Sequence, residues 1–320
     1  MGAKKSKAKS IHIVKVHPEK LRAFKATGAH GRKAKPTRAP AAGAAPRAPG
    51  FAANAALNLK DFHGKKIQTL SFTNIYLGSS QWSASDMTSI DTALSGAMSD
   101  PALNNVIQQY FDAPITTTFL GRNASDAAVP ATYTRDSVSA TLTQMYASGQ
   151  LSGVDFPNTL VNLLLPPGVI LDTTAAGGVG DLDDKDSSLE GLGGYHGSHV
   201  AADGTTIYFA AAVYSQSTAT GQNGIPVWPD SWKNVVATLY HELNEARTDA
   251  DVEQVNRSNN EGLLGWYSTQ GGEIGDIPIN EAGNDLQSVF VEVNLQSGQT
   301  APIQLMWSNA AEGPGEPFTK

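Results

Sequence analysis

The sequence predicts an α+β or α/β fold in which helices pack on a mixed β-sheet. Two observations lead to this fold class. Runs rich in β-branched and aromatic residues alternate along the chain with segments whose apolar residues recur at helical spacing. Hydrophobic residues make up 40% of the 320 positions, which is enough for a sizeable core between the layers.

The expected strands are short apolar runs that end at turn-forming residues. Most are rich in β-branched or aromatic residues, and the run NTLVNLLL is followed by two prolines, which cannot continue a central strand. The segment QSGQ predicts a turn that joins the last two runs into an antiparallel pair. In order, strands are expected at 66–78, 115–121, 158–165 and 204–214, with the pair at 288–295 and 301–309.

The expected helices begin at residues that favour helix N-termini. Residues 83–98 place Met87, Ile90 and Leu94 on one face, with Ser85 as the expected cap. Further helices are expected from Pro101 to 111, from a capping Asp136 to 147, and within 229–251, where Asp230 is the expected cap.

Charge is divided unevenly between a basic leader and an acidic body. Residues 1–50 contain 13 Lys and Arg against one acid, Glu19, whereas the other 270 residues contain 10 basic and 29 acidic side chains. The Ala, Pro, Gly and Lys composition of the leader cannot bury enough apolar surface to fold alone. We therefore expect a disordered leader over 1–60 and a single globular domain over 61–320.

Two roles for the leader stay open. One is an anchor for an anionic surface or acidic polymer, which its charge would attract. The other is a solubilising or targeting segment, and this interpretation is favoured because Phe24 is the only aromatic residue in 1–50. A nucleic-acid partner is disfavoured for the same reason, since no recognition motif or interleaved aromatic residue accompanies the basic charge.

The composition excludes several classes of protein. The chain has no cysteine, so disulfides, iron–sulfur clusters, thiolate zinc sites and cysteine nucleophiles are ruled out. No apolar run approaches the roughly 18–20 residues of a membrane-spanning helix, so no membrane span is expected.

The segment PDSWKNVVATLYHELNEARTDAD is the most informative part of the sequence. His241 and Glu245 project from the side of the predicted helix that faces away from its apolar residues. The pattern His-Glu-x-x-Glu resembles the zincin motif His-Glu-x-x-His, with Glu245 in place of the second histidine. His241 and Glu245 are then candidate ligands of Zn²⁺, and Glu242 is the candidate general base. The apolar positions of the helix are Trp232, Val235, Val236, Leu239, Leu243 and Ala246.

The alternative is a solvated helix face with no ligand, and other residues bear on the choice. The glycine-rich segment GLGGYHGSHV predicts a tight turn that could deliver His196 to the mouth of a cleft. For either His196 or His199 taken singly, a surface turn histidine is the favoured interpretation. Downstream, Glu273 and Asp276 in GGEIGD are candidates for a third ligand. Asp251 has metzincin spacing but ranks below both.

Six motifs in order resemble the plant phosphate-induced, EXORDIUM-like family and its bacterial relatives. They are GYHG, YFAAAVY, VWPD, LYHELNEARTD, GWY and GGEIGD, and the resemblance covers roughly residues 66–310. It implies an extracellular or cell-wall-associated protein with a zincin-like helix. It also assigns His241, Glu242 and Glu245 to the family's HELAE segment, Glu273 and Asp276 to its EIGD segment, and His196 to its GYH turn.

The sequence departs from this family at several positions. Relatives often carry cysteines where this chain has Pro226, Val227 and Ile277, and Ala250 stands where proline is usual. Without disulfides, the inference of an oxidising compartment is weaker. The leader also lacks the apolar core of a signal peptide, so a cytoplasmic location stays open.

Two functions follow from these residues. The first is a zinc-dependent metallohydrolase, most simply a peptidase, in which His241, Glu245, Glu273 and Asp276 supply ligands while Glu242 and His196 are catalytic. The second is a non-catalytic extracellular binding or signalling protein in which the same cluster is structural. The expected partner is a peptide or a cell-wall polymer.

Overall fold

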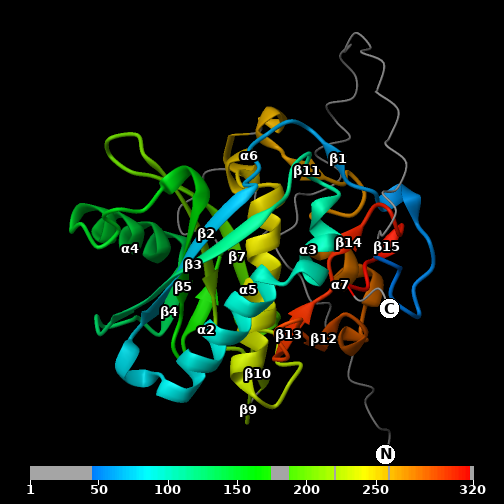
Figure 1. The fold of residues 1–320 in the computed structure, drawn as a ribbon. Helices are drawn as coiled ribbons and strands as arrows, with labels where there is room; N and C mark the ends of the chain where they lie inside the picture. The colour runs from blue at the N-terminus through cyan, green and yellow to red at the C-terminus, as the bar shows by residue number, and fades with distance from the viewer. Residues whose placement is uncertain (1–44, 174–186, 220, 259, 318–320) are drawn as a thin grey trace, which may run out of the picture.

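The computed structural model describes residues 45–173, 187–219, 221–258 and 260–317 (Figure 1). It confirms the α+β class, because helices pack on a mixed five-stranded sheet of order β3-β2-β5-β8-β7. Strand β7 runs antiparallel to β8, and the other pairs are parallel. The strands of this sheet are β2 (Thr69–Leu77), β3 (Thr116–Ser125), β5 (Thr159–Leu164), β7 (Gly194–Val200) and β8 (Thr206–Ala212).

Smaller ladders flank the main sheet. The antiparallel pair expected near the C-terminus is present as the β12–β13 hairpin, with Phe290 opposite Gln304 and Asn294 opposite Thr300. The strands of these ladders are β1 (Lys60–Asp61) with β11 (Trp266–Tyr267), β4 (Thr132–Thr134) with β6 (Ile170–Asp172), β9 (Gln216–Thr218) with β10 (Gly221–Asn223), β12 (Phe290–Asn294) with β13 (Thr300–Gln304), and β14 (Trp307–Ser308) with β15 (Gly313–Pro314).

The expected helices are all present, and α6 and α7 follow them in the chain. Within the described part of the chain, no helix has the length and apolar character that crossing a lipid bilayer requires. The α-helices are α2 (Ala84–Ser99), α3 (Pro101–Gln108), α4 (Arg135–Ala147), α5 (Ser231–Thr248), α6 (Val252–Ser258) and α7 (Asp276–Ala282).

Two helix caps differ from those expected. The side chain of Ser83, rather than Ser85, accepts a hydrogen bond from the first turn of α2. The side chain of Thr134, rather than Asp136, does the same for α4. Ser85 and Asp136 both lie inside the first turn, whereas a cap needs the extended backbone found at Ser83 and Thr134.

The two faces of the sheet pack against different helices. Successive side chains of a strand point to opposite faces, so the same strands supply two cores. Leu163 packs with Leu142 of α4 on one face, whereas Phe72 and Leu160 join Leu239 of α5 in the core on the other. Figure 1 shows α4 and α5 on opposite sides of the sheet. Helix α5 therefore lies between the sheet and the β12–β13 hairpin, which it also contacts.

The end of the predicted leader packs against the C-terminal segment. The backbone N–H of Ala48 donates to the carbonyl of Pro314, and Arg47 forms a β-bridge with Gly315. Leu59 is buried, and its N–H donates to the side chain of Asn309. Residues 45–60 therefore pack on the body, because their backbone donors find acceptors there. Residues 1–44 lie outside the described residues.

Burial in the central strand predicts a large stability difference between two leucines. Leu160 of β5 is fully buried, whereas Leu120 of β3 is 50% exposed. We expect Leu160→Ala to lower the free energy of unfolding by about 2–5 kcal/mol, because it leaves a cavity between α5 and the sheet. The matched change Leu120→Ala should stay within about 0.5 kcal/mol of wild type. Urea unfolding of the three proteins measures both values, and equal losses would contradict the assignment of this core.

Candidate metal centre

Helix α5 supplies His241, Glu242 and Glu245 from inside the protein. Every residue from Asn234 to Thr248 is buried, because the sheet, α2 and the β12–β13 hairpin surround the helix. The three side chains are only 1–2% exposed. The interpretation of this face as a solvated surface is therefore wrong. The polar side chains opposite the apolar stripe face a second wall of protein instead of water.

Strand β7 supplies His196, which corrects the prediction of a turn. The segment Gly194–Val200 pairs with β8, and His196 lies opposite Ala210. Residues directly opposite on paired strands point to the same face, and Ala210 belongs to the core beside α5. His196 therefore points at α5 and is buried. A Cβ atom on Gly194 would lie 3.0 Å from Thr238 Cγ2 of α5, so the glycines here allow close approach instead of a turn.

The start of α7 and the residues just before it close the cluster from the far side. The backbone N–H groups of Gly275 and Asp276 each donate to Glu245 Oε1 at 3.1 Å. A Cβ atom on Gly275 would lie 2.4 Å from His241 Nδ1, so only glycine allows this backbone to lie against the histidine. Glu273 and Asp276 are both buried here. Three of the six sequence motifs described above, GYH, HELNE and GGEIGD, thus meet at one place.

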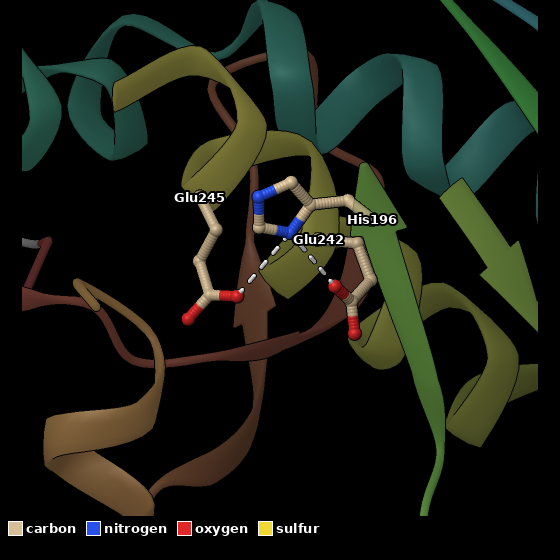
Figure 2. A group of neighbouring side chains, drawn as sticks. All are labelled: His196, Glu242 and Glu245. Carbon is tan, nitrogen blue, oxygen red and sulfur yellow. Dashed lines mark hydrogen bonds and ion pairs between the residues drawn. The ribbon is translucent and has the colours of Figure 1, made fainter. Parts of the chain in front are cut away.

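The ring nitrogens of the two histidines face carboxylates. His241 Nε2 lies 3.0 Å from Glu245 Oε2 and 4.0 Å from both Glu242 Oε1 and Asp276 Oδ1. His196 Nδ1 lies 3.3 Å from Glu242 Oε2 and 3.7 Å from Glu245 Oε2. Figure 2 shows His196 between the two glutamates. Oε2 of Glu245 is therefore the oxygen that both histidines approach.

The opposite nitrogen of each ring is already occupied. His241 Nδ1 lies 2.5 Å from Gln304 Oε1, and the Gln304 amide is oriented because its Nε2 donates to the Gly275 carbonyl at 2.6 Å. His196 Nε2 lies 3.2 Å from the Asp249 carbonyl. Since both partners are acceptors, these nitrogens carry the protons. His241 Nε2 and His196 Nδ1 are then the nitrogens that can bind a ligand, and both face carboxylate oxygens.

Burial lowers the pKa of both histidines, but the carboxylates outweigh it. The hydrogen bond to Glu242, with the charges of Glu245 and Glu242, raises the pKa of His196 above its ordinary value. The same two carboxylates raise the pKa of His241 to about 10. The neighbouring carboxylates therefore favour the protonated form of both imidazoles, and most strongly that of His241.

The pKa values of the buried acids shift in opposite directions. Burial raises the pKa of Glu245, but the charge of His241 outweighs burial, and the resulting pKa is lowered. Burial, with the charges of Glu245 and Asp249, holds the pKa of Glu273 well above its ordinary value. Burial also raises the pKa of Asp249 to about 8. The interior thus contains more carboxyl groups than its two histidines can neutralise.

Among the residues that the structure describes, two groups of side chains have the spacing of metal ligands. His241, Glu245 and Asp276 form one triad, and His196, Glu242 and Glu245 form the other. Ligands about 2.0–2.2 Å from a tetrahedral ion stand about 3.3–3.6 Å apart, which lies within the separations of 3.0–4.0 Å found here. The nitrogen and oxygen donors therefore fit a divalent metal ion, with zinc among the candidates.

The remaining predicted residues lie outside the two triads. Glu273 approaches the other nitrogen of His196, with Oε1 at 3.6 Å from Nε2. His199 bonds Thr143 at 3.0 Å, and Asp251 is positioned beside Tyr208. Gln304 was not predicted as a site residue. It is a polar residue within the otherwise apolar strand APIQLMW, and this was the pattern that could have indicated its role.

Comparisons with known proteins add little. No family model matches the sequence, and no curated protein matches it. Among solved structures, the chain is similar to metalloproteinase-II from Bacteroides fragilis, with 17% identity and a TM-score of 0.29 over 67% of this chain. The match spans about half, 52%, of that protein. At this level the similarity supports no inference about function.

The bond between Gln304 and His241 predicts a measurable effect on metal affinity. We expect Gln304→Leu to weaken Zn²⁺ binding by about 10- to 100-fold, because the acceptor that orients the imidazole is lost. Gln304→Glu keeps an acceptor at the same position and should bind Zn²⁺ more tightly than Gln304→Leu. Competition with a chromophoric chelator measures the three affinities. Equal affinities for wild type and Gln304→Leu would exclude an orienting role.

Proposed function

We propose that the protein is a zinc-dependent hydrolase whose substrate is a peptide. The observation that carries the proposal is the pair of buried imidazoles. Each has one nitrogen committed to an acceptor and the other directed at the carboxylates of one helix. Metal-binding histidines in proteins have this arrangement, in which the second nitrogen donates to an outer partner.

His241, Glu245 and Asp276 would hold the ion. Nitrogen and carboxylate oxygen are common zinc donors, and three protein ligands are typical of catalytic zinc. The carboxylate of Glu245 is already oriented by the two backbone N–H groups that occupy its other oxygen. An ion bound there would supply Lewis-acid chemistry toward a carbonyl group or water.

Glu242 and His196 would take part in proton transfer during hydrolysis. Glu242 is adjacent to His241 on α5, so its carboxylate reaches the same space without being a member of that triad. It would act as general base. His196 lies 3.3 Å from Glu242, close enough to stabilise the charge of this carboxylate and to exchange a proton with it.

Membership of the EXORDIUM-like family is part of the same proposal. It is supported by the convergence of the GYH, HELNE and GGEIGD motifs on one cluster, since residues shared for a common site must meet in space. We also propose that the protein is extracellular or associated with the cell wall, as the family resemblance implies, and that the basic leader can contact anionic surfaces.

Burial favours a second candidate function, a non-catalytic binding or signalling protein. All six side chains of the cluster are at most 5% exposed: His196, His241, Glu242, Glu245, Glu273 and Asp276. Structural zinc sites are closed, whereas catalytic sites keep one position open. Under this alternative the group of His241, Glu245 and Asp276 would be structural and would hold α5 and the start of α7 together, so its loss would affect stability alone.

Metal content tests the site itself. After incubation with Zn²⁺ and dialysis, we expect about one tightly bound zinc per wild-type chain, by mass spectrometry, and a loss of this ion in His241→Ala. The matched control is His199→Ala, which removes a histidine of β7 that lies outside both triads. It should retain the ion. Folded wild-type protein without zinc would refute the zinc site and the hydrolase, and would leave the non-catalytic candidate with a hydrogen-bonded cluster.

Hydrolysis separates the two functions. We expect Glu242→Gln to keep the tightly bound zinc but to lower the cleavage rate of a mixed fluorogenic peptide library by about 100- to 10,000-fold, because the proton acceptor is lost. Wild-type protein that binds zinc, gains thermal stability from it and cleaves nothing would support the non-catalytic candidate. Equal rates for wild type and Glu242→Gln would exclude Glu242 as the base.

A further inference from the structure

The two triads share one residue, Glu245, but divide the two histidines between them. Within each triad the ligand atoms lie within 4.8 Å of one another. An ion held by His241, Glu245 and Asp276 leaves the nitrogen of His196 and the nearby carboxylate of Glu242 facing each other in the second triad. The cluster is therefore larger than one mononuclear site needs.

The cluster also contains more possible ligands than one ion needs. Four carboxyl groups, those of Glu242, Glu245, Glu273 and Asp276, are buried beside two histidines. Two histidines with four carboxylates is also the donor composition of dinuclear carboxylate centres in helix bundles.

The position of Glu245 suits a shared ligand. Oε1 accepts the N–H groups of Gly275 and Asp276, so the carboxylate cannot rotate freely. Oε2 then lies 3.0 Å from His241 Nε2 and 3.7 Å from His196 Nδ1, nitrogens that belong to different triads. An oxygen placed between two such nitrogens can contact an ion on either side. In two-metal sites the ions are about 3.5–4 Å apart.

We propose that a second divalent cation binds between His196 Nδ1, Glu242 Oε2 and Glu245 Oε2, with Glu245 bridging it to the first. The nitrogen and oxygen donors suit first-row divalent ions such as Zn²⁺ and Mn²⁺. One consequence rests on the proposed hydrolase function. A Glu242 carboxylate bound to the second ion cannot accept a proton, so this ion inhibits hydrolysis when metal is abundant.

The number of bound ions and their magnetic coupling test the second position. Metal-free full-length protein is titrated with Zn²⁺ by calorimetry, and with Mn²⁺ alone by electron paramagnetic resonance. We expect two ions per wild-type chain, and an exchange-coupled signal from the two Mn²⁺ ions. His196→Ala should bind one ion and show an uncoupled signal, whereas His199→Ala should behave like wild type. Circular dichroism checks folding, and Glu242→Gln replaces His196→Ala if that variant does not fold.

Each other outcome has a separate meaning. One Zn²⁺ per wild-type chain would overturn the second position and leave the proposed hydrolase intact. No bound ion in folded wild-type protein would overturn both. Two ions without magnetic coupling, unchanged by His196→Ala, would place the second ion elsewhere and overturn the inference.

Discussion

The carboxylate of Glu245 connects three segments that are far apart in the sequence. It projects from α5, accepts hydrogen bonds from two backbone N–H groups at the start of α7, and faces the histidines of α5 and β7. Each of these interactions is stronger than it would be in water, because the site is buried and its effective dielectric constant is low. The same burial means that loss of this carboxylate would leave the N–H groups of Gly275 and Asp276 without their acceptor and His241 Nε2 without its nearest carboxylate oxygen.

The burial of α5 on all sides is the constraint behind this arrangement. A helix between a sheet and a hairpin has no solvent face for its polar residues, so they must find partners inside. Glycines allow the neighbouring segments to lie close enough to α5 to provide these partners. Gly194 has no side chain, so Thr238 of α5 can pack against β7, and Gly275 lets the backbone lie against His241. The structure therefore concentrates several acids and two histidines in a small buried volume.

Closure of the cluster limits how it can function. Protons and ions reach a buried site through local opening, whereas a peptide needs a larger displacement of one wall. The wall formed by Gly275 and Asp276 contacts the cluster through two hydrogen bonds to a single oxygen, which a bound ion would hold in place. Occupation of the site by metal would thus affect both the charge of the interior and the order of this segment.

Local patterns in the sequence determined the fold class, the expected strands and helices, and the common face of His241 and Glu245, because these depend on residues a few positions apart. They also identified Glu273 and Asp276 as candidates by resemblance. The glycines of GYHGSHV indicated a turn, yet pairing with β8 and contact with α5 make this segment a strand. Only the tertiary structure brought His196, Asp276 and Gln304 to α5 and divided the ligands into two triads. Strand register and the packing of distant segments depend on interactions across the whole chain, which no short-range pattern contains.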